Sequence, residues 1–158
     1  MAKHNNDSPR PPPSFDDCLR DLASQLQTPT GTRPQSQLRS QSLELLKKLY
    51  LPQLSPADLA KSPAFCWLPI VCHLQGASHA LDHALYTFCA IQVAITKSGS
   101  ICVDEAMQIY YSSLQTLQVE LGDDNAAQKD EILGAISVLS TCEVPKPLST
   151  LCAFSAVR

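Results

Sequence analysis

Two histidines share one face of a predicted helix and lie close in sequence to a thiol. His79 and His83 are four residues apart, and Cys72 and His73 precede them. Imidazole nitrogens together with a thiolate are ligands that zinc accepts, so this group is a candidate metal site. The HExxH pattern of zinc peptidases is not met, because Ala80 follows His79. We therefore expect these histidines to pack at a helix–helix contact or to face solvent, and we predict no metal ligands.

Other polar groups that could carry chemistry also have structural explanations. The loop Lys97–Ser100 lacks the GxxxxGK[ST] spacing of a phosphate-binding loop, which favours a turn between helices. Four acidic residues lack the spacing of a calcium loop and are expected to favour the start of a helix: Asp123, Asp124, Asp130 and Glu131. The adjacent Tyr110 and Tyr111 are predicted to belong to the core.

The cysteines indicate thiols rather than a disulfide framework. Their number, seven, is odd, no CxxC pair occurs, and no apolar signal segment precedes them. A reducing compartment is the natural inference. Cys89 and Cys142 fall at or beside apolar helix faces, where cysteine acts as a small hydrophobe. Because no nucleophile elbow or catalytic cysteine setting is present, we predict no catalytic residue, no cofactor and no enzyme activity.

The elements that would position these residues divide the chain into four parts. Residues 1–13 are polar and proline-rich and predict a disordered tail. Residues 14–27 predict a short helix, because acidic residues follow Ser14 and leucines recur at helical spacing. Residues 28–41 predict a linker, and residues 42–158 a helical region. From Ile70 to Val144 there is no proline, as successive helices require.

Three long helices are predicted between Gly76 and Glu143. The first is apolar over a broad arc, with a more polar opposite side that carries His79, Asp82, His83 and Tyr86. A helix that is apolar over most of its circumference is usually central in its domain, so we expect this one to have neighbours on more than one side. The inward stripe of the second is Val103, Met107, Tyr110, Leu114, Leu117 and Leu121. The inward residues of the third, from about Gln128 to Cys142, are Ile132, Leu133, Ile136 and Leu139. Short loops favour antiparallel neighbours, so the predicted fold class is all-α, built from antiparallel helical hairpins.

The charge balance argues against nucleic acid and membrane as direct partners. The formal net charge is −3, the sequence pI is about 5.7, and no long basic run occurs. Electrostatic binding to DNA or to anionic lipid needs a basic surface. The stretch Ser62–Leu81 lacks charged residues but contains proline, glycine and two histidines, so no membrane span is expected.

A family resemblance emerges from the anchor residues of the three helices. The segments are Ala80-Leu81-Asp82-His83-Ala84-Leu85 with Ala90, then Glu105-Ala106 with Tyr110, Leu114 and Leu117, then Asp130-Glu131-Ile132-Leu133 with Leu139 and Glu143. Together with Cys66-Trp67-Leu68-Pro69-Ile70, this pattern resembles the fungal-specific transcription factor domain over about residues 65–143. That domain is the regulatory middle region of fungal binuclear zinc cluster activators.

The resemblance implies a nuclear, non-enzymatic role in transcription through helix-face packing. The chain departs from the family in lacking the six-cysteine zinc cluster, and Pro145 and Pro147 interrupt the pattern where the family's helices continue. We therefore expect a fragment-like regulatory domain that self-associates or needs a protein partner and does not bind DNA itself. The alternative is a small tetratricopeptide-like scaffold that binds a peptide, although no second copy appears at a period of about 34 residues.

Overall fold

The computed structural model describes residues 12–27, 35–50 and 66–142, together with Ser55, Ala57 and Lys61. This part of the chain is helical and contains no strand, which confirms the all-α prediction. In chain order its elements are α1 (Phe15–Leu26), α2 (Gln35–Tyr50), α4 (Leu68–Cys72), α5 (His79–Thr96), α6 (Val103–Leu121), the short 3-10 helix η1 (Ala126–Gln128) and α7 (Asp130–Cys142). The predicted tail up to residue 11, linker residues 28–34 and the segment after Cys142 lie outside the described residues.

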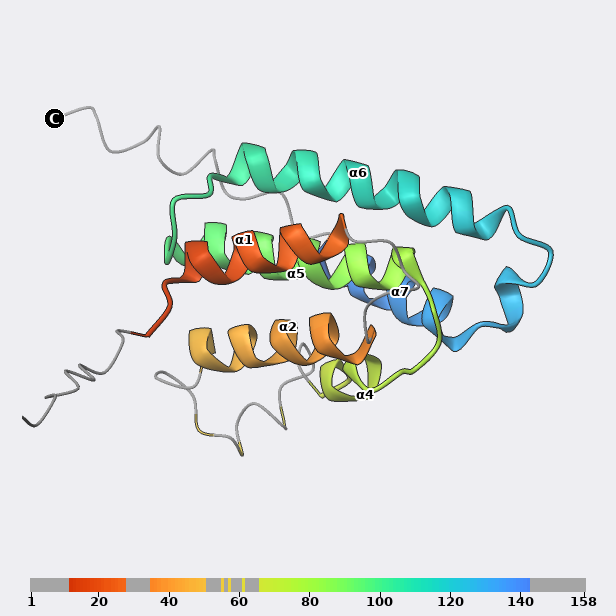
Figure 1. The fold of residues 1–158 in the computed structure, drawn as a ribbon, viewed down its shortest axis with the longest axis horizontal. Coiled ribbons are helices and arrows are strands. Elements are labelled where there is room, and N and C mark those ends of the chain that lie inside the picture. The colour runs from red at the N-terminus through yellow and green to blue at the C-terminus, as the bar shows by residue number, and fades with distance from the viewer. Residues whose placement is uncertain are drawn as a thin grey trace, which may run out of the picture.

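Helix α5 lies at the centre of the described fold. Helices α1, α2, α6 and α7 all contact it, and Figure 1 shows them arranged around it, with α6 running alongside. Two thirds of its residues are buried, many of them small: Ala80, Leu81, Asp82, Ala84, Leu85, Thr87, Phe88, Cys89, Ala90, Ile91, Val93 and Ala94. A helix apolar around most of its circumference needs neighbours on several sides, as the sequence predicts for this one.

Local capping explains where the main helices begin and end. Ser14 and Asp17 form a reciprocal capping box at the start of α1, where each side chain accepts a hydrogen bond from the other residue's backbone N–H. The Ser78 hydroxyl accepts the Leu81 N–H at 3.1 Å and caps α5. Helix α5 ends at Lys97, which adopts the left-handed conformation with a φ of 53°. These caps fix where α1 and α5 begin and where α5 ends.

Helix α2 begins earlier than the sequence suggests. Residues 35–41 were predicted as the end of a linker, but they form the first two turns of α2. The polar composition of this stretch conceals two buried positions, since Leu38 and Arg39 are both 0 % exposed. Tertiary burial therefore overrides a composition that is typical of a loop.

Helices α6 and α7 are rotated relative to the predicted stripes. In α6 the buried residues are Ala106, Tyr110, Ser113 and Leu117. In α7 they are Ile132, Gly134, Ala135, Val138, Leu139 and Cys142. Tyr110, Leu117, Ile132 and Leu139 were predicted correctly. The prediction was wrong for five residues that lie on the outside, namely Val103, Tyr111, Leu121, Leu133 and Ile136. Small residues, among them Ser113, Gly134 and Ala135, make up part of each buried face, and small residues at a contact let helix axes come close.

Within the part of the chain that the structure describes, no helix has both the length and the apolar character needed to cross a bilayer.

Candidate functional site

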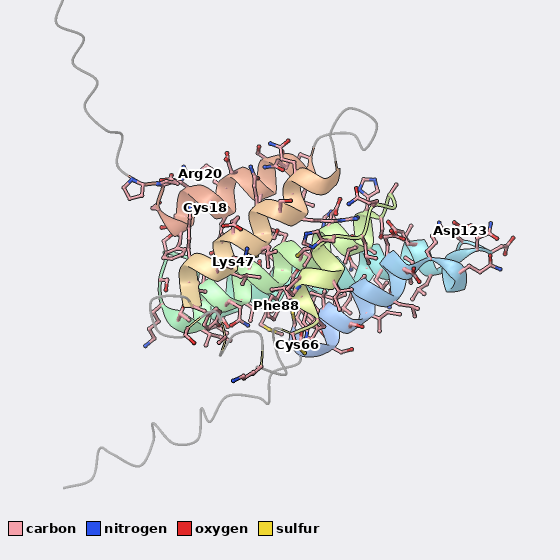
Figure 2. All side chains as sticks on the ribbon, turned by 90° about the horizontal axis from the view of Figure 1, so that it is seen from below. Cys18, Arg20, Lys47, Cys66, Phe88 and Asp123 are labelled. Carbon is pink, nitrogen blue, oxygen red and sulfur yellow. The ribbon has the colours of Figure 1, made fainter. Side chains whose placement is uncertain are left out.

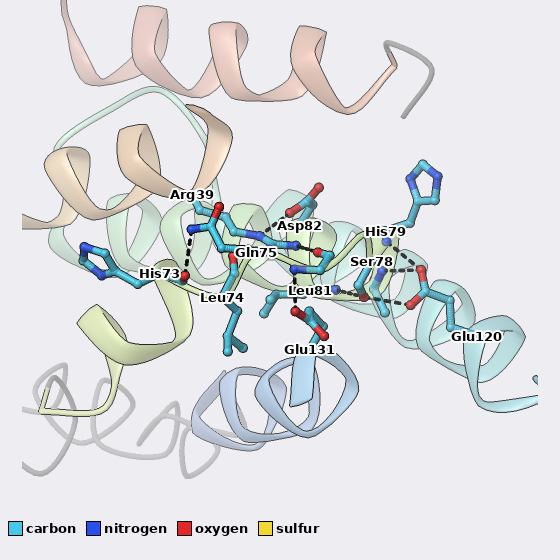
Figure 3. Close-up of polar contacts among 12 residues, drawn as sticks. Arg39, His73, Leu74, Gln75, Ser78, His79, Leu81, Asp82, Glu120 and Glu131 are labelled. Atoms are coloured by element: carbon cyan, nitrogen blue, oxygen red, sulfur yellow. Dashed lines mark hydrogen bonds and ion pairs between the residues drawn. The ribbon is translucent and has the colours of Figure 1, made fainter. Parts of the chain in front are cut away.

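The candidate metal ligands are not brought together. His79 is exposed at the first position of α5, and His83 lies half-buried one turn further along. Cys72 is buried at the end of α4, while the neighbouring His73 is exposed and its Nδ1 contacts the Pro69 carbonyl. In Figure 3, His73 and His79 lie at opposite ends of the cluster. Among the described residues, no group of three or more His, Cys, Asp or Glu side chains is placed to hold a metal ion.

The Lys97–Ser100 loop binds a carboxylate from the same chain. The Ser100 N–H donates to Asp16 Oδ1 at 2.8 Å, which ties the loop to the first turn of α1. A Cβ on Gly99 would lie 2.5 Å from that same oxygen, so glycine permits the close approach. The loop is thus a helix–helix connection that anchors α1, as the sequence predicts for a turn.

Two of the four acidic residues around the start of α7, Asp123 and Glu131, make different contacts. Asp123 accepts a hydrogen bond from Lys129 Nζ at 2.7 Å, and both side chains are partly exposed. Glu131 instead reaches across to the α4–α5 loop, where its Oε1 accepts the Gly76 N–H at 2.6 Å. Helix capping alone, as predicted from the sequence, therefore does not account for Glu131, whose bond is a tertiary contact.

A buried ion pair joins α2 to α5. Arg39 Nε donates to Asp82 Oδ1 at 2.9 Å, with side-chain exposures of 0 % and 2 %. The same guanidinium donates to the Leu74 carbonyl and, at 3.0 Å, to the Gly76 carbonyl (Figure 3). Charged groups this deep are found where they are paired and hydrogen-bonded. Arg39 therefore fixes α2, α5 and the loop between α4 and α5 in one arrangement.

Sequence reasoning missed this pair. It placed Arg39 in a linker and Asp82 on the polar side of a helix. One signal was available, because an acid inside an otherwise apolar helix needs a cation or several donors if it is buried. The sequence could not identify Arg39 as that cation, since the two residues are 43 positions apart.

Glu120 from the end of α6 caps the start of α5. Its Oε1 accepts the N–H groups of His79 at 2.6 Å and Ala80 at 3.0 Å, and its Oε2 accepts the Ser78 hydroxyl at 2.7 Å (Figure 3). A helix N-terminus carries unsatisfied N–H donors and a partial positive charge, both of which favour a carboxylate. The N-terminal donors of α5 are thus used within the fold.

Burial sets the ionisation of the interior groups. Burial raises the pKa of Cys72 and of Cys142 to about 12, and it raises the pKa of Cys89 as well. Burial lowers the pKa of His83, and the neighbouring His79 lowers it further, against the opposing effect of Asp82 and Glu120. Burial thus favours the thiol over the thiolate at these three positions. Cys89 and Cys142 lie in the core, as predicted for small apolar side chains on apolar helix faces.

A small hollow lies between α1 and α2. Its volume is about 200 Å³ and its lining mixes charges and apolar groups, including Cys18, Asp21, Leu22, Glu44 and Lys48. Ligand sites usually enclose about 300–1,000 Å³ of mostly apolar space with converging polar groups. This hollow therefore has the character of an ordinary gap between two surface helices.

Large apolar side chains remain on the outside of α6 and α7. Helices α6 and α7 pack against each other as well as against α5. Thr87 bonds Ser113, and Glu120 bonds the start of α5, so these residues mark the side of α6 that faces α5. The α6–α7 face is defined here by Val103 (49 % exposed), Tyr111 (59 %), Leu121 (46 %), Leu133 (57 %) and Ile136 (39 %).

Helical spacing places the exposed apolar residues of each helix on one side of that helix. Val103, Tyr111 and Leu121 lie on one flank of α6, which also carries the half-buried Met107 and Leu114. Leu133 and Ile136 lie on the side of α7 away from Gly134, and a Cβ on Gly134 would meet side chains of α4, its connecting loop and α5. Two adjoining helices thus present bulky side chains outward.

No protein-family model, curated protein or solved structure matches this chain.

Proposed function

We propose that this chain is a non-enzymatic regulatory domain that acts in transcription by packing its α6–α7 face against another protein. The observation that carries the proposal is the group of five exposed, bulky apolar side chains on two adjoining helices. Soluble domains seldom leave a large contiguous apolar surface exposed unless a partner covers it. Several charged side chains of the fold, by contrast, bond to helix ends and loops of the same chain: Arg39, Glu120 and Glu131.

The link to transcription rests on the family resemblance. The three main segments that carry it fall within α5, α6 and α7, apart from Glu143, which follows α7 in the sequence. The remaining segment, Cys66–Ile70, leads into α4 and forms its first residues. In that family the helical region is regulatory and the DNA contacts are made elsewhere. The proposal therefore places the chain in the nucleus as a protein-binding partner rather than a DNA-binding one.

A reporter assay tests this function. The full chain is fused to an unrelated DNA-binding domain in a fungal cell, and transcription of a reporter with the matching DNA site is measured. We expect the fusion to change reporter output relative to the DNA-binding domain alone. The paired substitutions Tyr111→Ser and Leu133→Gln should abolish the change, because they remove apolar area from the face.

Val119→Ser is the matched control. Val119 is 79 % exposed on α6 but lies on a different flank of the helix from Tyr111. The control fusion should keep the wild-type effect at equal protein levels. Reporter output that equals that of the DNA-binding domain alone would contradict the proposed function.

A further inference from the structure

The charge of the chain is unevenly distributed. Residues 103–142, which form α6, α7 and their connection, contain seven acidic side chains and one lysine, so their formal net charge is −6. Because the whole chain carries −3, all other residues together carry +3. Figure 2 shows Asp123 at the far tip of the α6–α7 pair, with Arg20 and Lys47 on α1 and α2. The α6–α7 half is thus strongly acidic.

Acidic side chains lie at both ends of the α6–α7 face. Asp104 follows Val103 at the start of α6 and is exposed. At the other end, the exposed Asp124 and Asp130 stand near Leu121 and Leu133 in the sequence. The lysine of this region, Lys129, already bonds Asp123. The face therefore combines an apolar centre with acidic ends.

From this combination we propose that the occupant of the α6–α7 face is an amphipathic helix of another protein, with apolar residues on one side and Lys or Arg on its flanks. The inference rests on the proposed function and names the chemistry of the partner. The outer side of two packed helices can accept a third helix, whose apolar side chains would cover Tyr111, Leu133 and Ile136. Basic flanks would then meet Asp104, Asp124 and Asp130.

The acidic side chains of this face disfavour three other occupants: a second copy of the chain, an anionic membrane and a nucleic acid. A second copy of the chain would bring the exposed Asp104, Asp124 and Asp130 of one face against those of another acidic α6–α7 region, and like charges repel at contact. An anionic membrane or nucleic acid would be repelled for the same reason. A basic helix is the occupant whose charge complements this face.

A matched pair of peptides tests the inference on the full chain. Both are labelled 18-residue helices with leucines at positions i, i+3, i+4 and i+7, and the flanking positions are lysine in one and glutamate in the other. Fluorescence anisotropy measures the Kd of each peptide at low salt. We expect the lysine peptide to bind at least about ten-fold more tightly, with the difference shrinking at ~0.5 M salt as the charges are screened.

Substitutions assign the binding to this face. Replacing Asp104, Asp124 and Asp130 together by Asn should weaken the lysine peptide by roughly ten-fold, the combined effect of three exposed charge pairs. Tyr111→Ser with Leu133→Gln should weaken it further still, and the control Val119→Ser should leave the Kd unchanged. All these positions are on the surface, and far-ultraviolet circular dichroism would verify that each variant remains folded.

Each contrary result has a distinct meaning. Equal binding of both peptides, lost in the Tyr111→Ser and Leu133→Gln variant, would overturn the basic partner while leaving the face as an interface. Absence of binding by either peptide, or equal weakening by Val119→Ser, would overturn the inference and leave the reporter assay to decide the proposed function. Sedimentation at the same low salt would show whether the chain dimerises. A dimer that Tyr111→Ser disperses would identify a second copy as the occupant and would also overturn the inference.

Discussion

The buried ion pair of Arg39 and Asp82 links three parts of this fold through hydrogen bonds. The guanidinium bonds one carboxylate and two backbone carbonyls, and all of these contacts cross between separate elements. A buried pair of this kind adds little net stability compared with apolar residues of the same volume, but losing one partner leaves an uncompensated charge. Its contribution is thus to fix which residues of α2, α5 and the α4–α5 loop meet.

Removal of the Arg39 cation should destabilise the chain. Arg39→Met leaves the Asp82 carboxylate buried without its cation, and breaking such a pair costs about 3–5 kcal/mol. Urea denaturation followed by circular dichroism measures the loss. The double variant Arg39→Met with Asp82→Leu should recover part of it, because no charge is then left buried.

Arg20→Met is the matched control for this test. Arg20 bonds Asp17 at 2.9 Å on the surface of α1, where its side chain is 75 % exposed. Its substitution should leave the urea midpoint unchanged. A wild-type midpoint for Arg39→Met would show that the buried pair does not hold the helices together.

His83 should make stability depend on pH. Burial holds its pKa in the folded chain below the ordinary value of 6.5. The unfolded state therefore binds more protons as the pH falls through that value, and the free energy of unfolding decreases. Between pH 7.5 and 5.5 the wild-type chain should lose stability, and His83→Gln should lose less. His73→Gln, at an exposed site, should keep the wild-type pH dependence, and an unchanged dependence in His83→Gln would contradict the assignment.

At the scale of the elements, side chains from neighbouring helices fix the position of α5. Its own sequence supplies an apolar surface and the Ser78 cap, but α6 supplies Glu120 at its N-terminus and α2 supplies Arg39 at its first buried acid. The loop that leaves α5 is held by Asp16 of α1. The ends of the central helix are thus fixed by three elements distant in sequence.

Glu120→Ala should lower stability through the start of α5. The substitution removes the acceptor for two backbone N–H groups and the Ser78 hydroxyl, and loss of a helix cap costs about 1–2 kcal/mol. Urea denaturation measures the change. Gln115→Ala, at an exposed position of α6, is the control and should have little effect. Equal stability of the two variants would mean that the carboxylate cap contributes nothing measurable.

For the whole molecule, the decisive feature is that the helices do not cover all of their apolar side chains. The α6–α7 face remains open in the described structure, while α5 is enclosed by four helices. A hydrophobic dye such as ANS should therefore bind the folded chain and fluoresce. Tyr111→Ser with Leu133→Gln should reduce that signal and leave the free energy of unfolding within about 0.5 kcal/mol of wild type, as expected for surface substitutions. A wild-type chain that binds no dye would show that the face is covered.

The sequence by itself determined the helical class, the central position of α5 and the approximate extent of the three long helices. These properties follow from local patterns, namely proline-free segments, a 3.6-residue period and glycine-containing loops. It also predicted that Cys89 and Cys142 would be buried, since a small apolar side chain on an apolar face has little alternative.

Only the tertiary structure decided which part of each apolar stripe faces inward. Gly134 illustrates the reason, because a Cβ there would lie 3.2 Å from Leu74 Cδ1 and 3.4 Å from Leu81 Cδ1. Close approach selects small residues for the contact and turns Leu133 and Ile136 outward, although they are more hydrophobic. Hydropathy counts apolar area on one helix, whereas packing depends on the shape of its neighbours, which lie far away in the sequence.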